Sequence, residues 1–258
     1  MNPAMLTLDI SGPLATLTLN RGAQRNALLP QTLEEIIGAC QHIQSTNSVS
    51  VLLLRGAGPS FSVGFDLKNM AALLAGGIPD RGALESAAQL GQDAVAALQN
   101  LNVITLGAAH GHAIGGGFLL LAACDIRVAA TDTVFSIPEV DLGLPLTWGG
   151  VPLLMRELGP SLARELIVSC RNFGTDLLLP NGFLCRRYAP ENFDESVAEF
   201  AAELAQKPAW ALKASKQQFS TAFSNSAGET DTALFANAVL HPDFLPNAMR
   251  YLASIRSK

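Results

Sequence analysis

The chain has 258 residues, of which 49% are hydrophobic and 15% are charged, and its formal net charge is −5. Charged residues make up about 25% of an ordinary domain, so we expect this chain to bury some apolar surface between subunits. The acidic balance argues against nucleic acid as the main partner.

The cysteines and the apolar runs indicate the compartment. The four cysteines show no CxxC spacing, and in a chain of this length they indicate reduced thiols: Cys40, Cys124, Cys170 and Cys185. Residues 1–5 lack the basic and apolar regions of a secretory signal. The longest apolar runs are far shorter than a membrane span. We therefore expect a cytoplasmic protein with no membrane partner.

The N-terminal part predicts a hairpin, a helix and a buried strand. Residues 5–10 and 14–19 alternate apolar and polar side chains around a Ser-Gly-Pro turn, which is typical of a β-hairpin. Apolar residues recur at helical spacing over 30–45, after a proline that suits a first helical turn. Residues 49–54 then form a continuous apolar run, which predicts a short buried strand.

A glycine-containing turn follows this strand over residues 55–68. Its glycines, Gly56, Gly58 and Gly64, do not have the GxGxxG spacing, and no phosphate-loop lysine follows them. We therefore reject a dinucleotide or nucleoside triphosphate site here. Residues 70–85 are rich in Ala and Gly, which favours a surface loop over the alternative of a mobile lid. Residues 86–100 predict a helix.

The centre of the chain repeats this plan. The apolar run 103–109 leads into a turn with three successive glycines, Gly115 to Gly117, and an apolar helix-like run follows. Glycines allow close backbone approach and positive φ, and a helix start offers free N–H groups. Two such strand–turn–helix units side by side would bring two N–H groups together, which suits a developing oxyanion. The simpler alternative is a tight turn between a strand and a helix.

Four motifs in order resemble the crotonase superfamily, also called the enoyl-CoA hydratase/isomerase family. They are FSVGFDL at 61–67, GHAIGGG at 111–117, ACDIR at 123–127 and FSIPEVDLGLP at 135–145, and the likeness covers roughly residues 5–170. The resemblance implies an α/β fold, the ClpP-like crotonase spiral of repeated ββα units, with a C-terminal helical trimerisation region. Residues 1–195 would form the spiral core with the acyl-CoA site, and 196–258 the helical oligomerisation region.

The resemblance also implies the substrate and its binding residues. The substrate would be an acyl-CoA thioester, with CoA as part of the substrate, no separate cofactor and no metal, bound by a homotrimer or a dimer of trimers. The oxyanion donors would be the N–H groups of Phe65 and Gly116. Arg25, Ala27 and Lys68 would contact CoA, although both cations are equally explained as solvated surface charges. The other substrate-site positions are Ser62, Gly64, Asp66, Leu67, Gly115, Leu119 and Trp148, among which Gly64, Asp66 and Gly115 would hold the loops.

The departures from the family pattern bear most on the reaction. Family hydratases use two glutamates around the double bond; one position is Leu119 here and the other is Glu139. A single carboxylate moves one proton between two carbons more readily than it holds water and also delivers a proton. The sequence therefore favours enoyl-CoA isomerisation with Glu139 as base. Glu139 as a capping residue after Pro138 is the structural alternative.

Other polar residues near these motifs have weaker interpretations. Thr147 stands where some dienoyl isomerases and dehalogenases of the family place an aspartate. Threonine cannot act as a carboxylate nucleophile, which argues against aryl dehalogenation by that route. Asp141 would share a face with Glu139 on an extended stretch, but a local loop role is favoured. Trp148 would line the acyl pocket or simply pack. His110 and His112 form an HxH pair without an evident third metal ligand.

Two further functions stay open besides isomerisation. The first is a 2-enoyl-CoA hydratase, a lyase, in which other groups hold the water. The second is an acyl-CoA binding protein without catalysis, suggested by Leu119 and Thr147. In the C-terminal part, Asn192 followed by Glu195 predicts a helix start with a capping box, and residues 210–223 predict another helix.

Overall fold

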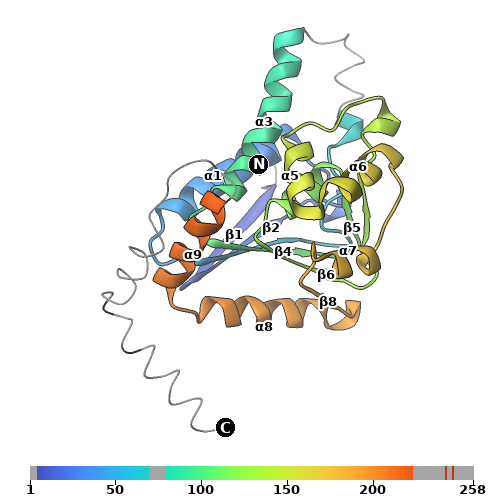
Figure 1. Ribbon diagram of the computed structural model, residues 1–258. Coiled ribbons are helices and arrows are strands. Elements are labelled where there is room, and N and C mark those ends of the chain that lie inside the picture. Colours follow the sequence, from blue (N-terminus) through green and yellow to red (C-terminus); the bar gives the residue numbers. More distant parts are fainter. Residues whose placement is uncertain (1–4, 70–79, 223–241, 243–245, 247–258) are drawn as a thin grey trace.

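The computed structural model describes residues 5–69, 80–222, 242 and 246 (Figure 1). The expected loop or lid over 70–85 falls largely on residues 70–79, which lie outside the described residues. More than half of the expected oligomerisation region also lies outside them, at residues 223–241, 243–245 and 247–258. The expected division after residue 195 falls in the first turn of a helix that begins at Phe193, and it stays a prediction.

Six strands form the main sheet, in the order β1-β2-β3-β4-β6-β8. Their bounds are β1 Leu6–Ser11, β2 Leu14–Leu19, β3 Val51–Gly56, β4 Ile104–Ala109, β6 Ile126–Ala130 and β8 Arg186–Tyr188. The strands β1 and β2 pair antiparallel, which confirms the predicted hairpin, and the remaining neighbours pair parallel. A small second sheet joins β5 (His112–Ile114) to β7 (Val134–Ser136) in parallel.

Helices cover both faces of the main sheet. Their bounds are α1 Pro30–Ser45, α3 Arg81–Gln99, α4 Gly116–Ala122, α5 Gly150–Leu158, α6 Pro160–Ser169, α7 Thr175–Asn181, α8 Phe193–Ala205 and α9 Ala209–Ala222, with short 3₁₀ turns η1 Gly22–Gln24, η2 Val140–Leu142 and η3 Pro190–Asn192. In Figure 1, α8 runs beneath the sheet while α1 and α3 lie above it. The parallel strands are therefore buried on two sides, which explains their continuous apolar runs.

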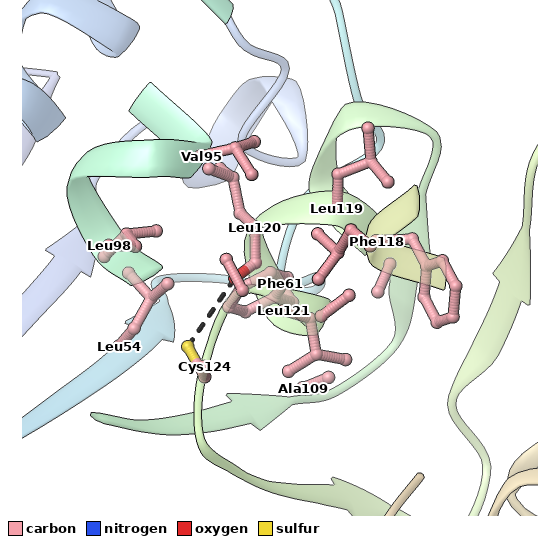
Figure 2. Packing of buried hydrophobic residues seen from close by; sticks show 14 of the residues in the cluster. Leu54, Phe61, Val95, Leu98, Ala109, Phe118, Leu119, Leu120, Leu121 and Cys124 are labelled. Atoms are coloured by element: carbon pink, nitrogen blue, oxygen red, sulfur yellow. Dashed lines mark hydrogen bonds between the residues drawn. The ribbon is translucent and has the colours of Figure 1, made fainter. Parts of the chain in front are cut away.

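Strand β3 shows how alternation divides the core in two. Leu52 and Leu54 point into the larger cluster with α1, α3 and α4, whereas Leu53 points into a smaller cluster between the sheet and α8. Figure 2 shows the larger cluster around α4, with Leu119, Leu120 and Leu121 projecting from one helical turn. All seven residues of α4 are buried, so the helix that starts at Gly116 is held rigidly at the centre of the molecule.

The structure corrects two local expectations. The run after Gly111 is not a turn leading straight into a helix, because residues 112–114 form β5 before α4 begins. Asn192 is the N-cap of α8 but its side chain makes no capping hydrogen bond, so the predicted capping box is wrong. The reason is local: the 3₁₀ turn η3 immediately precedes α8, and the N-cap residue has φ −111° and ψ 7° rather than extended backbone.

Candidate active site

The two glycine turns lie side by side. Ser62 forms a parallel bridge with Ala113: its N–H donates to the His112 carbonyl over 3.0 Å and its carbonyl accepts from Ile114 N–H at 3.0 Å. Gly64 follows at φ +80°, and a Cβ there would stand 2.7 Å from the Ile114 carbonyl oxygen and 3.5 Å from the Gly116 nitrogen. Only glycine fits at Gly64, because a side chain would push the two turns apart.

The N–H groups of Phe65 and Gly116 are left over by this pairing. On either side of Phe65, the Gly64 carbonyl accepts from Leu28 N–H at 2.8 Å and Asp66 N–H donates to the Leu28 carbonyl at 2.9 Å. Gly116 is the first residue of α4, where an N–H has no partner within its own helix. Among the described residues, neither N–H donates a hydrogen bond. The fold thus presents two unused donors on adjacent turns.

Glu139 lies directly against the second turn. A Cβ built on Gly115 would stand 2.6 Å from Glu139 Oε1, and Gly115 has φ +50°. The other carboxylate oxygen, Oε2, is buried and has no hydrogen-bond partner among the described residues. Burial raises the pKa of Glu139, and a hydrogen bond from its own backbone N–H opposes this more weakly. A carboxylate oxygen that is buried without a hydrogen-bond partner costs folding free energy, and such groups concentrate at functional sites.

The second glutamate position of the family pattern is apolar in three dimensions as well as in sequence. Leu119 is 2% exposed, and a Cβ on Gly150 would stand 2.9 Å from Leu119 Cδ2. Asp141 is exposed on the 3₁₀ turn η2, so the stretch after Glu139 is not extended and Asp141 is a loop residue. Thr147 is exposed. The geometry therefore offers one carboxylate, Glu139, at the turn.

Trp148 packs beside both unused donors. A Cβ on Gly116 would stand 2.5 Å from Trp148 Cζ3, and the Phe65 and Trp148 rings meet edge to face with centroids 6.4 Å apart. A Cβ on Gly91 in α3 would stand 2.0 Å from Trp148 Cε2. Sequence reasoning missed Gly91, since a glycine in a helical pattern gives no sign of what lies opposite it.

The expected CoA-contacting residues lie at the edge of the same turns. Arg25 and Lys68 are exposed, and neither forms an ion pair within the described residues. Leu67 is 50% exposed, whereas Ala27 is buried and its carbonyl accepts from the Arg21 guanidinium. Lys68 lies two residues after Asp66, in the helical residues 67–69, and Arg25 lies in the turn before Leu28, which bridges to Phe65. The two cations therefore stand on neighbouring segments.

Asp66 and Ser62 hold these loops together. Arg21 forms an ion pair with Asp66 at 3.2 Å, and Asp66 Oδ1 accepts from the N–H groups of Lys68 and Asn69. These contacts lower the pKa of Asp66 against the opposing effect of its burial. Ser62 Oγ donates to the Asn26 carbonyl at 2.8 Å and accepts from Gly64 N–H. Sequence reasoning missed Arg21, because its partner lies far along the chain.

The histidines beside the glycine turns, His110 and His112, lie close to polar atoms of the loop at 58–60. His110 Nε2 donates to the Gly58 carbonyl at 2.8 Å, and His112 Nδ1 lies 3.1 Å from Ser60 Oγ. In the part of the chain that the structure describes, no group of three or more His, Cys, Asp or Glu side chains is placed to hold a metal ion. Burial raises the pKa of Cys124 to about 12, so that thiol is not a nucleophile at neutral pH. No helix among the described residues is long and apolar enough to span a bilayer.

Comparisons with known proteins identify the family. The family model for enoyl-CoA hydratase/isomerase matches residues 9–246. A short-chain-enoyl-CoA hydratase of Clostridium acetobutylicum is 31% identical over 81% of this chain and 78% of its own. A crotonyl-CoA hydratase of Syntrophomonas wolfei is also 31% identical, over 88% of this chain and 83% of its own.

A solved structure shows the same fold over almost the whole chain. The enoyl-CoA hydratase of Mycobacterium smegmatis superposes with a TM-score of 0.85 at 26% identity, covering 97% of this chain and 96% of that one. The α/β fold is therefore the crotonase fold expected from the motifs, with a helical C-terminal region. The chain belongs to the enoyl-CoA hydratase/isomerase family of the crotonase superfamily, and is an enzyme of that family acting on acyl-CoA.

Proposed function

We propose that this enzyme moves a carbon–carbon double bond in an acyl-CoA thioester, converting a β,γ-enoyl-CoA to the α,β-enoyl-CoA. The proposal rests on the half-buried carboxylate of Glu139. Its Oε1 lies against the turn that holds the free N–H of Gly116, and its Oε2 is buried without a hydrogen-bond partner among the described residues. Leu119, at the second glutamate position, is buried among apolar side chains.

The chemistry follows from these groups. The thioester carbonyl oxygen accepts hydrogen bonds from the N–H groups of Phe65 and Gly116. Glu139 removes a proton from the α carbon, and the electron pair moves into a dienolate whose oxygen gains charge against the two donors. The same carboxyl group returns the proton to the γ carbon, which leaves the double bond between the α and β carbons. The substrate gains and loses no atoms overall, so one carboxylate that moves one proton suffices.

The environment of Glu139 supports the role of base. Burial raises the pKa of the carboxyl group, and a general base works best with a pKa closer to the working pH. A carboxylate that is destabilised in the resting enzyme accepts a proton more readily than one in water. The contact of Glu139 with Gly115 fixes how far the Glu139 carboxylate lies from the neighbouring oxyanion donor, the N–H of Gly116.

The binding of CoA is proposed for two exposed cations, Arg25 and Lys68. They lie on neighbouring segments, Arg25 in a turn and Lys68 in the helical residues 67–69, and would contact the phosphates of the nucleotide, while Ala27 and Leu67 line the approach. Replacing both cations with Ala would raise KM for acyl-CoA with little change in kcat, since CoA is remote from the reacting carbons. We also propose a homotrimer or a dimer of trimers, which light scattering on the full chain would test.

A second candidate is hydration of a 2-enoyl-CoA. The names of the relatives favour it, since two of them are called a short-chain-enoyl-CoA hydratase and a crotonyl-CoA hydratase. Hydration requires a group besides Glu139 to hold the water, and the apolar Leu119 does not supply it.

Separate reactions with a β,γ-enoyl-CoA and an α,β-enoyl-CoA distinguish the two. We expect the β,γ substrate to give a product of equal mass and different retention, identical to authentic α,β-enoyl-CoA. A product heavier by one water from the α,β substrate would instead establish hydration. Product formation by neither substrate would refute both.

A further inference from the structure

The indole of Trp148 fills the space between α3 and the start of α4. A Cβ on Gly91 of α3 would stand 2.0 Å from Trp148 Cε2 and 2.1 Å from Nε1, and a Cβ on Gly116 would stand 2.5 Å from Cζ3. Each glycine therefore makes room for one edge of the indole. The ring has no space to move toward either helix, because its atoms are already in close-packed contact with the backbone at both glycines.

The backbone at Trp148 is unfavourable for a large residue. Trp148 has φ +56° and Gly149 after it has φ +68°. A bulky side chain at positive φ is an outlier that persists only where surrounding structure enforces it. Glycine would fit this backbone with less strain, so the indole is retained at a conformational cost. That cost points to a role for the ring beyond filling the core.

The ring stands at the place where an acyl chain would continue. Gly115 and Gly116 are consecutive, and Glu139 lies against the first while Trp148 lies against the second. A thioester held by the Gly116 N–H with its α carbon at Glu139 has its next carbons within reach of the indole. The Phe65 ring meets that indole edge to face, so two aromatic rings border the carbons beyond the double bond.

The indole packs against the main core cluster, which contains Leu119 and Leu146. A Cβ on Gly150 would stand 2.9 Å from Leu119 Cδ2 and 3.0 Å from Leu146 Cδ2, and both leucines are buried, at 2% and 8% exposure. A longer acyl chain would have to displace either the indole or these leucines. The leucines belong to the main core cluster, which leaves the indole as the removable barrier.

We propose that Trp148 closes the acyl site and restricts this enzyme to short acyl chains, an inference that rests on the proposed acyl-CoA function. The residue sets specificity by volume. Its removal should therefore change the ratio of kcat/KM between long and short acyl chains, whatever its effect on the absolute rate with a short chain.

The test compares wild type with Trp148→Gly, the substitution that suits φ +56°, and with Trp148→Phe. Straight-chain enoyl-CoAs of four, six, eight and ten carbons are assayed for kcat/KM, and the saturated acyl-CoAs are titrated for Kd by calorimetry. We expect wild-type affinity to stay level or fall as the chain lengthens. In Trp148→Gly we expect affinity to rise about tenfold for each two-carbon extension, as apolar burial predicts, with Trp148→Phe in between.

A second variant approaches the indole from the opposite helix. In Gly91→Ala the new methyl group collides with the ring, so we expect turnover of the four-carbon substrate to fall about tenfold or more. Measured against Trp148→Gly alone, the added Gly91→Ala substitution should cause no such loss, because the ring with which the methyl group collides is gone. Gly38→Ala is the matched control, because Gly38 lies in helix α1 with nothing within 4 Å of its added Cβ.

The outcomes separate this inference from the function beneath it. Equal chain-length profiles in wild type and Trp148→Gly, with the four-carbon substrate still turned over, would overturn the role of Trp148 and leave the function standing. Failure of the protein to bind any acyl-CoA would overturn both. If Gly91→Ala still lowers turnover when Trp148 is already Gly, then Gly91 acts through the fold of α3. That result would contradict the inferred contact between Gly91 and a Trp148 barrier.

Discussion

The carboxylate of Glu139 rests on the backbone of Gly115, so closely that a Cβ at Gly115 would stand 2.6 Å from Glu139 Oε1. This contact joins two segments that meet only through folding: the glycine turn before α4 and the turn η2 after β7. Gly115 N–H donates to the Ser136 carbonyl at 2.9 Å, which fixes the approach of the two segments. The position of the proposed base is thus determined by a glycine.

Gly115→Ala should displace Glu139 and lower activity. The methyl group would collide with Oε1, and Ala at φ +50° adds backbone strain. We expect kcat to fall by about 10²-fold, since small misplacement of a catalytic group has effects of this size, and the unfolding free energy to fall by about 1–2 kcal/mol. Steady-state kinetics and thermal unfolding measure the two effects.

Gly143→Ala is the control for strain. Gly143 has φ +75° and nothing lies within 4 Å of an added Cβ there. It should lose stability to a similar extent but keep kcat within about threefold, because no group is displaced. An equal loss of kcat in both variants would show that strain, rather than the collision with Glu139, lowers activity.

The pH dependence of kcat/KM should follow the ionisation of Glu139. The base acts only when ionised, so activity rises with pH through the pKa of this carboxyl group, which burial places above its ordinary value. Glu139→Gln should lower kcat by about 10²–10⁴-fold and remove this acid limb from any residual activity. An acid limb that survives in Glu139→Gln belongs to another group, and Glu139 would not be the base.

The folding stability should fall with rising pH because of Glu139, whereas the activity should rise. Because the pKa of Glu139 is higher in the folded than in the unfolded chain, the folded state binds the proton more tightly, and stability is lost as pH rises through that interval. At pH values below the pKa of Glu139 in the unfolded chain no stability is lost. At pH values above its pKa in the folded chain the loss of stability is complete. Glu139→Gln should therefore raise Tm at neutral pH and leave it nearly unchanged near pH 4. Equal shifts at both pH values would contradict the linkage.

The buried ion pair of the C-terminal helix α9 should matter far more than its exposed neighbours. Lys216 is 3% exposed and donates to Asp125 Oδ1 at 2.6 Å, while Asp125 Oδ2 accepts from the backbone and hydroxyl of Thr105. Lys216→Met leaves this carboxylate without its charge partner, and we expect a loss of about 3 kcal/mol. Chemical denaturation would measure it.

Lys207→Ala provides the comparison for Lys216. Lys207 is 53% exposed and stands 3.9 Å from Glu203, so its loss should change the unfolding free energy by less than about 0.5 kcal/mol. Similar effects for the two lysines would mean that the buried pair does not anchor α9.

The sequence predicted the elements that local patterns determine. Alternation identified the hairpin of β1 and β2, helical spacing identified α1 at its observed bounds, and the motifs around Phe65 and Gly116 identified turns that do lie side by side. Each of these follows from residues close together in the chain.

Contacts between distant residues were not predictable from a single sequence. The ion pair of Arg21 with Asp66 and the close contact of Trp148 with Gly91 each join segments that are far apart in the sequence. No local sequence pattern indicates either contact. Asp141 was expected to share a face with Glu139 only if the chain were extended, and the 3₁₀ turn η2 removes that condition. The role of a residue such as Trp148 depends on which helix comes to lie opposite it, and only the fold determines that.

If Glu139 alone carries one proton between two carbons, a β,γ-enoyl-CoA deuterated at the α carbon should reveal the transfer. With wild type we expect α,β-enoyl-CoA in which part of the deuterium has moved to the γ carbon, seen by mass spectrometry and NMR, and no such product with Glu139→Gln. Deuterium transfer that persists in Glu139→Gln, or a product that has gained water in place of a shifted double bond, would contradict the account.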